Sequence, residues 1–165
     1  MTKRTRQYIG LLSAVAAYYL IHEGAHLLYA LSTGVFKQVN FMGLGIQIDI
    51  YADRLTNTQL GIFCLVGTLA TQATAYIMVL MANPICHSPV QLPKAICYYI
   101  TIALLLLDPI YLSILCGFVG GGDMNGIAYL LPEPIARIAL GVLLLINAAV
   151  FWKLVLPRYS ASFQE

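Results

Sequence analysis

Apolar residues fill four stretches of the chain, and each stretch is close to the length that a helix needs to cross a bilayer. They run over about 8–31, 60–81, 95–119 and 135–156. A bilayer core about 30 Å thick requires roughly 20 mostly apolar residues in one helix. We therefore expect an all-α polytopic membrane protein with about four transmembrane helices, forming a single domain over residues 1–165.

The segment between the first two stretches has a different period. Apolar and polar side chains alternate over residues 46–51, which read Ile-Gln-Ile-Asp-Ile-Tyr. A period of two is typical of a half-exposed strand. Residues 39–41 fit a preceding strand, and Gly43-Leu44-Gly45 fits the turn between them. This pattern predicts a short β-hairpin over about 35–51 at the membrane face, with an irregular loop as the alternative.

The composition excludes several classes of protein. Hydrophobic residues make up 60% of the chain and charged residues 10%, whereas soluble domains contain about 45–50% and about 25%. An ordinary soluble domain and a disordered chain are therefore excluded. The net charge of +2 is too small to favour a nucleic-acid partner. The four cysteines have no CxxC spacing, so we expect free thiols.

The basic residues flanking the apolar stretches predict an orientation, because cytoplasmic loops carry an excess of Lys and Arg. With four spans, the side of the N-terminus would hold more of these residues than the other side. The first group is Lys3, Arg4, Arg6, Lys94, Lys153 and Arg158, and the second is Lys37, Arg54 and Arg137. We expect a multi-pass protein of the cell membrane with its N-terminus in the cytoplasm.

One short motif places three ionisable groups inside the first apolar stretch. His22-Glu23-Gly24-Ala25-His26 has the pattern HExxH. Residues i and i+4 of a helix lie one turn apart on one face, so both imidazoles can reach one metal ion. Glu23 is placed to hold a water bound to that metal and to accept its proton. The alternative is a chance match with both histidines hydrogen-bonded in a bundle core, but ionisable groups in an apolar span are costly and favour a functional site.

A hydrolytic zinc site uses three protein ligands and one open position, and two aspartates are candidates for the third ligand. Asp108 lies deep in the third stretch, directly before Pro109, and Asp123 follows a run of glycines at the end of that stretch. Asp108 could instead be a packing acid hydrogen-bonded to a neighbouring helix. Asp123 could instead be a helix N-cap. The residue types alone leave both assignments open.

The second stretch has a polar stripe, because Thr68, Thr71 and Gln72 fall on one helical face. Such residues mainly supply hydrogen bonds between packed membrane helices. Thr71 and Gln72 are also candidates for contacts with a substrate, as is Asn125, which follows Asp123 closely.

Taken in chain order, these features resemble the site-two protease family of membrane-embedded zinc metalloproteases. The HExxH motif lies in a span, and Thr33-Gly34-Val35 and the strand-like Phe41-Met42-Gly43-Leu44-Gly45 follow it, similar to the family's membrane-face sheet. Gly67-Thr68-Leu69-Ala70-Thr71 stands where the family has Gly-Pro-x-Ala-Asn, without its proline and asparagine. Gly122-Asp123-Met124-Asn125-Gly126 corresponds to the family's Leu-Asp-Gly and favours Asp123 over Asp108 as a ligand. The resemblance covers about residues 1–130 and implies a minimal, divergent member.

The resemblance implies an intramembrane zinc metalloprotease that hydrolyses peptide bonds of membrane-associated proteins or peptides in the lipid bilayer. His22, His26 and Asp123 would bind Zn²⁺, and Glu23 would act as the general base. Asp108 would be an alternative ligand or would line a polar cleft. The other function left open is a non-catalytic metal-binding membrane protein, either a metal transporter or a degenerate protease relative. The family holds its zinc toward the cytoplasm, whereas the basic residues place this site on the opposite side.

Overall fold

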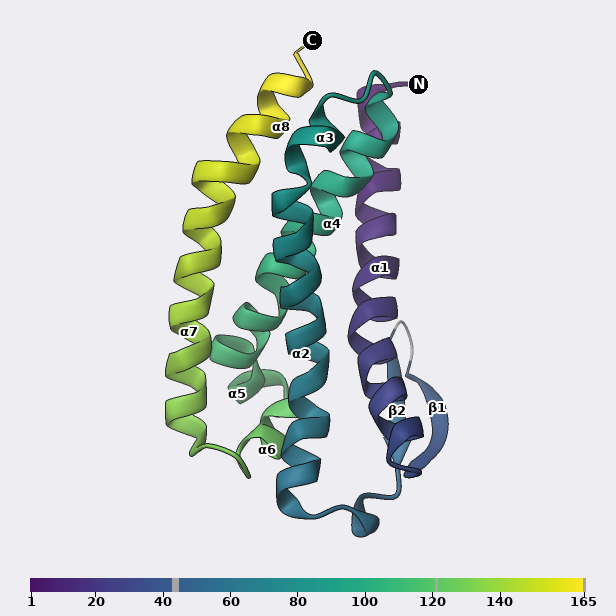
Figure 1. Cartoon of the computed structure of the whole chain (residues 1–165), viewed down its shortest axis with the longest axis vertical. Coiled ribbons are helices and arrows are strands. Elements are labelled where there is room, and N and C mark those ends of the chain that lie inside the picture. Colours follow the sequence, from purple (N-terminus) through teal and green to yellow (C-terminus); the bar gives the residue numbers. More distant parts are fainter. Residues whose placement is uncertain (43–44, 121, 165) are drawn as a thin grey trace.

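The computed structural model describes residues 1–42, 45–120 and 122–164, and most of them are helical. The long helices run side by side along the longest axis, and the two chain ends lie together at one end of the bundle (Figure 1). We call this the terminal end, and we call the opposite end, where the two strands pack, the site end. The elements, in chain order, are α1 (Lys3–Ser32), β1 (Phe36–Met42), β2 (Gly45–Ile50), the 3₁₀ turn η1 (Ala52–Arg54), α2 (Asn57–Leu80), α3 (Ala82–Cys86), α4 (Gln91–Ile110), the π-helix η2 (Tyr111–Leu115), α5 (Cys116–Val119), α6 (Asp123–Ile127), α7 (Glu133–Val150), the π-helix η3 (Phe151–Val155) and α8 (Leu156–Ser162).

Within the described residues, three helical segments are long and apolar enough to cross a membrane, and they suggest a membrane protein. These segments are Asn57–Leu80, Gln91–Val119 and Glu133–Ser162. They correspond to three of the four expected spans. The fourth expected span falls on α1, which is 30 residues long but has its apolar run interrupted by the HExxH motif.

Each long helical segment begins a few residues before the apolar run that predicted it, because its first turn lies in a polar flank. Thr2 caps α1, since its side chain accepts a hydrogen bond from the backbone N–H of Thr5. Thr56 and Gln59 form a reciprocal capping box at the start of α2. Hydropathy detects the apolar interior of a helix and misses these polar first turns.

The predicted hairpin is confirmed in the described residues. β1 pairs antiparallel with β2, with Val39 opposite Ile48 and Phe41 opposite Ile46. Ile48 is buried while its neighbour Gln47 is exposed, as the alternation predicted. The expected turn falls on Gly43 and Leu44, which lie outside the described residues.

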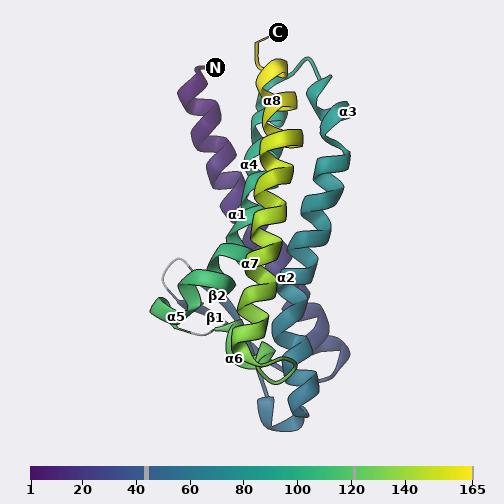
Figure 2. The ribbon, with the colours of Figure 1, turned by 90° about the vertical axis from the view of Figure 1, so that its left-hand side faces the viewer.

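The helix that begins at Gln91 loses its regularity beyond Asp108. Pro109 has no N–H, so it leaves the carbonyl of Leu105 without its helical partner. Asn147 of α7 replaces that partner, because its side-chain amide donates to the Leu105 carbonyl at 2.7 Å. The π-helical turn η2 follows directly, and such turns inside helices are frequent at functional sites. The short helix α5 then turns away from the bundle axis toward the strands (Figure 2).

Two apolar clusters form the interior, one in each half of the bundle. The cluster at the site end joins residues of α1, β2, α2, η2, α6 and α7, including Phe63 and Ile48. The cluster nearer the terminal end joins α2, α4, η3 and α8, including Leu104 and Tyr159. The polar residues described next lie at the site end and along its border with the terminal half.

Candidate metal centre

Helix α1 brings the two histidines of the HExxH motif together inside the protein. His22 and His26 are one turn apart and both are buried. Their Nε2 atoms lie 3.2 Å from each other. The sequence prediction that both rings face one point is therefore confirmed in the structure.

Asp123, the first residue of α6, completes a compact group with these two nitrogens. Its Oδ2 atom lies 3.1 Å from Nε2 of His22 and 3.5 Å from Nε2 of His26. We call these three atoms the ligand triangle. His22, His26 and Asp123 form a group whose ligand atoms could hold a metal ion.

The loop before Asp123 reaches the triangle through glycines in conformations that other residues rarely adopt. Gly120 has φ +108° and Gly122 has φ +44°. Tyr111 fastens this loop, because its hydroxyl donates to the carbonyl of Gly120 at 2.9 Å. The backbone conformation of this loop thus places the Asp123 carboxylate beside the histidines. Asp123 is not the N-cap of α6, because Gly122 has that position.

The dimensions of the triangle fit a four-coordinate zinc ion. Zinc binds imidazole nitrogen and carboxylate oxygen at about 2.0–2.2 Å, so tetrahedral ligand atoms lie roughly 3.3 Å apart. The three observed separations of 3.1, 3.2 and 3.5 Å lie close to this value. Two imidazoles and one carboxylate are also ligand types that zinc prefers.

A glycine of α2 makes room for the two imidazoles. A Cβ atom built on Gly67 would lie 2.6 Å from Nε2 of His26 and 2.7 Å from Nε2 of His22. Real Cβ atoms do not approach other atoms so closely. Gly67 therefore lets α2 pass directly against the ligand triangle.

Asp108 lies on the far side of the His22 ring from the triangle. Nδ1 of His22 is 3.2 Å from Oδ1 and 3.3 Å from Oδ2 of this carboxylate. The hydroxyls of Tyr18 and Thr71 both donate to the same carboxylate, and Asp108 is only 1% exposed. A histidine that binds metal through one nitrogen commonly donates from the other nitrogen to a carboxylate. The structure therefore places Asp108 behind a candidate ligand rather than among the ligands.

The remaining predicted residues lie in other surroundings. Thr71 is fully buried against Asp108, and Gln72 donates from its amide to the carbonyl of Leu104 at 2.9 Å. Asn125 is exposed and lies two residues after Asp123. Thr71 and Gln72 thus form hydrogen bonds between packed helices, which is the main role predicted for the polar stripe. Neither residue is among those that line the cleft in the described chain.

An open cleft of about 350 Å³ leads to the triangle. The side chains of Glu23, His26 and Asp123 line it on one side, and β2 lines it over Gly45–Ile48. Phe63, Tyr111 and Gly122 complete the wall. Glu23, which is half-buried, therefore shares one cavity with two of the three candidate ligands.

Sequence reasoning missed the two tyrosines of this site. Tyr18 precedes His22 by one helical turn and stacks on its ring with centroids 5.3 Å apart, so i, i+4 spacing could have placed it on the same face. Tyr111 had no such signal, because its position depends on the π-helical turn in which it lies.

The comparisons with known proteins leave the geometry of the site as the main source of functional evidence. No model of a known family, no curated protein and no solved structure matches this chain.

Proposed function

We propose that the chain is a membrane-embedded zinc metallopeptidase, of the kind that the resemblance to site-two proteases implies. The observation that carries this proposal is the ligand triangle of His22, His26 and Asp123, with Glu23 in the same cleft. Two nitrogens and a carboxylate oxygen at tetrahedral spacing, with the Glu23 carboxylate lining the same cleft, have the composition of a hydrolytic zinc site.

His22, His26 and Asp123 would hold the ion beside the cleft that Glu23 lines. A zinc ion held there would lower the pKa of a bound water to about 7 and would polarise a scissile carbonyl. Glu23 would accept the proton of the attacking water and pass it to the leaving amine. Asp108 would fix the tautomer of His22 and orient its ring, so that Nε2 stays available to the metal.

Strand β2 supplies a way to hold an extended substrate. It borders the cleft beside Glu23, and a segment added along a strand gains main-chain hydrogen bonds. The carbonyls of a transmembrane helix are occupied by its own hydrogen bonds, so such a substrate must unwind before it is cut. Membrane-associated proteins or peptides, extended along β2, are the substrates that fit this arrangement.

In this proposal α1 is the fourth span, and the protein is a multi-pass protein of the cell membrane. The 30 residues of α1 exceed the length required to cross a bilayer. Its polar motif faces α2 and α6 rather than lipid, since His22 and His26 are buried. A reporter fused to either chain end would locate both ends on the same side of the membrane.

Glu23→Gln tests the chemistry. The variant is expected to keep stoichiometric zinc and to lose cleavage of a co-expressed membrane substrate by about 10²–10⁴-fold, because only the proton acceptor is removed. Glu133→Gln is the matched control, since that carboxylate forms a surface ion pair with Arg137 and does not line the cleft in the described residues, and it should retain full cleavage. Cleavage by Glu23→Gln at the level of the control would remove Glu23 from the mechanism.

Zinc flux would separate this function from that of a non-catalytic metal-binding protein. The purified protein in sealed vesicles is expected to carry no zinc across the membrane. Flux that depends on His26 would indicate a transporter instead.

A further inference from the structure

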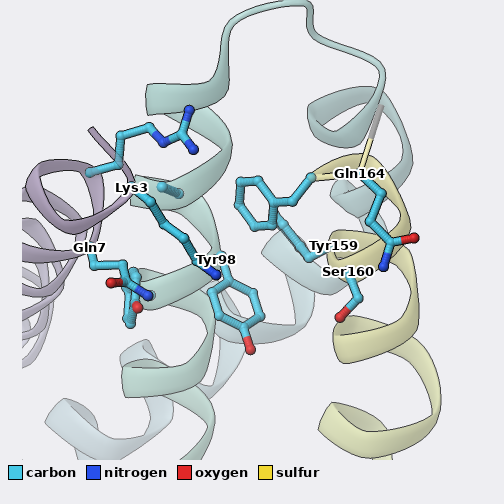
Figure 3. A pocket seen from close by; sticks show the side chains of 10 residues that line it. Lys3, Gln7, Tyr98, Tyr159, Ser160 and Gln164 are labelled. Atoms are coloured by element: carbon cyan, nitrogen blue, oxygen red, sulfur yellow. The ribbon is translucent and has the colours of Figure 1, made fainter. Parts of the chain in front are cut away.

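A second cavity, of about 390 Å³, shares no lining residue with the cleft at the ligand triangle. It is lined by residues near both chain ends, which lie together at the terminal end (Figure 1). Three helices that are distant in sequence form its walls: the start of α1, the first half of α4 and the end of the α8 segment. Figure 3 shows Lys3 and Gln7 on one side, Ser160 and Gln164 on the other, and Tyr98 of α4 between them. Its volume lies in the lower part of the range of about 300–1,000 Å³ that is typical of small-molecule sites.

Among the described residues, the charged side chains that line this cavity are both positive. Lys3 and Arg6 both line it, and no acidic side chain is among the lining residues of the described chain. Over residues 1–42, 45–120 and 122–164, neither cation forms an ion pair. Gln7, Ser160 and Gln164 add neutral hydrogen-bond donors. The positive charge of Lys3 and Arg6, together with these donors, therefore favours an anion in the cavity.

The floor of the cavity is aromatic. Tyr98 and Phe163 pack edge to face, with ring centroids 6.3 Å apart, and Tyr98 packs on Tyr159 at 5.2 Å. Aromatic rings with polar edges concentrate at the level of lipid headgroups. A cavity lined by both cations and aromatic rings suits a lipid at the boundary between its headgroup and its acyl chains.

The framework around the cavity is fixed by specific contacts. Lys94 is 3% exposed and donates to the carbonyl of Ser162 at 2.8 Å, which ties the end of α8 to α4. Gly10 lets α1 press on α4, since a Cβ there would lie 2.5 Å from the ring of Tyr99. The three walls are therefore held in place by packing and hydrogen bonding within the chain.

The position of the cavity along the chain places it at a membrane surface. Lys3 and Arg6 precede the apolar part of α1, and Leu11 and Leu12 in the next turns are 53% and 69% exposed. If the helices cross the bilayer, the two cations lie at headgroup depth and the exposed leucines lie beside acyl chains. Basic pockets between transmembrane helices bind anionic headgroups in this way.

We propose that this cavity binds the phosphate of an anionic phospholipid, with Lys3 and Arg6 as its charged contacts. The inference depends only on the protein being in a membrane and not on the metal centre. Its failure would leave the peptidase proposal intact, and a failure of the peptidase proposal would leave this site intact.

Native mass spectrometry of the full chain in detergent tests the site with two lipids of identical acyl chains, phosphatidylglycerol and phosphatidylcholine. The protein is expected to retain phosphatidylglycerol preferentially. Lys3→Gln with Arg6→Gln should reduce this preference by about fivefold per cation removed, the effect of a basic residue near a lipid surface. Equal retention of the two lipids by the unaltered protein would overturn the proposal.

A charge-matched control separates a site from a general surface effect. Arg4→Gln with Arg158→Gln removes two cations from the same end, and neither residue lines the cavity. This pair should leave the lipid preference essentially unchanged, and an equal loss in both double variants would overturn the proposal. Soluble glycerol 3-phosphate is the third arm. Displacement of phosphatidylglycerol by comparable concentrations of it would assign the cavity to a soluble phosphate compound and overturn the lipid assignment.

Discussion

The two ends of the bundle are built from the same kind of apolar sequence but differ in the regularity of their backbone. At the terminal end the described chain is almost entirely helical, and its interior is made of alanine, valine and leucine side chains together with Tyr159, which packs on Tyr98. At the site end the described chain contains a hairpin, three glycines with positive φ and a short helix, and its π-helical turn η2 has a counterpart in η3 of the other half. The ligand triangle lies at this irregular end, where a glycine-containing loop brings Asp123 to the two histidines of α1.

Irregular backbone at membrane depth is tolerated only where other groups satisfy its hydrogen bonds. The site end meets this requirement with side chains from neighbouring elements. Arg137 of α7 donates to the carbonyls of Ser113 and Ile114, each at 3.2 Å, and Tyr111 donates to the carbonyl of Gly120. The comparison of the two ends indicates that several polar side chains of the site end have a structural role. They hydrogen-bond to the irregular backbone that positions the ligand triangle.

Gly67→Ala should have the largest effect on zinc binding and cleavage, because the new side chain would press directly on the ligand triangle. The disturbance would be confined to the site end. The new Cβ would meet both Nε2 atoms at under 3 Å, so the rings or α2 must move. A displacement of about 1 Å at a catalytic group can cost 100-fold in rate, and overpacking costs about 1–3 kcal/mol of stability. We expect loss of bound zinc by metal analysis and a cleavage rate about 100-fold lower.

Gly24→Ala is the matched control, since a Cβ on Gly24 meets nothing within 4 Å although the residue lies between the two histidines. It should keep zinc and gain about 0.5–1 kcal/mol from helix propensity. Equal zinc content in the two variants would show that the close approach of α2 is not required by the metal centre.

Asp108→Asn should have the next largest effect and would separate ligands from the residues that support them. An amide keeps the size of the side chain but cannot supply a carboxylate to His22, so zinc affinity should fall by about 10–100-fold. Asp123→Asn, which alters the triangle itself, should reduce zinc affinity further. Competition with a zinc chelator measures both, and a weaker effect of Asp123→Asn would exchange the roles assigned to the two aspartates.

The sequence predicted the helices and the first two candidate ligands because both depend on local spacing. His22 and His26 share a face by helical geometry alone, and the period of two in residues 46–51 predicts one buried strand face. The relation between Asp108 and Asp123 depends on how the helix beyond Pro109 bends and where the glycine loop returns. No periodicity encodes that path, which is why residue types left the two aspartates interchangeable. The pairing of Asn147 with the Leu105 carbonyl depends on the same bend.

Asn147→Leu tests whether the border between the two halves needs its hydrogen bonds. Asn147 is fully buried and donates to the carbonyl of Leu105 and to Oε1 of Gln72, each at 2.7 Å. A leucine would leave these acceptors unpaired, at a cost of about 1–3 kcal/mol. Tyr76→Phe removes only the hydroxyl that donates to Asn147 and should cost about 0.6 kcal/mol, the average for hydrogen bonds between membrane helices.

Unfolding of both variants in mixed micelles with increasing denaturing detergent measures this difference. The expected order is the unaltered protein, then Tyr76→Phe, then Asn147→Leu, from most to least stable. An Asn147→Leu variant as stable as the unaltered protein would show that the bend at Pro109 needs no side-chain partner.

The smallest effect is expected at the outer face of the hairpin, where the irregular end meets solvent. Nζ of Lys37 lies 2.9 Å from Oδ2 of Asp49. The hydrogen bond from Lys37 holds the pKa of the Asp49 carboxyl below its ordinary value, and the same bond raises the pKa of Lys37. Exposed ion pairs add little to stability, so Lys37→Gln should leave the unfolding transition at pH 7 unchanged.

The titration of Asp49 remains measurable even where stability does not change. Because the folded pKa is lowered, the contribution of this carboxyl is fully present above its unfolded pKa of about 3.9 and is lost as the pH falls through the folded value. The raised pKa of Lys37 makes its contribution present below about pH 10.4 and lost as the pH rises through the folded value. The contribution of the pair to stability is thus constant over the neutral pH range. Carboxyl ¹³C shifts should place the titration midpoint of Asp49 below its ordinary value in the unaltered protein, and nearer to that value in Lys37→Gln. An unchanged midpoint would mean that Lys37 and Asp49 are not paired in solution. The outer face of the hairpin would then lack this fixed polar contact, and it would differ more from the buried, hydrogen-bonded surroundings of the ligand triangle than the structure indicates.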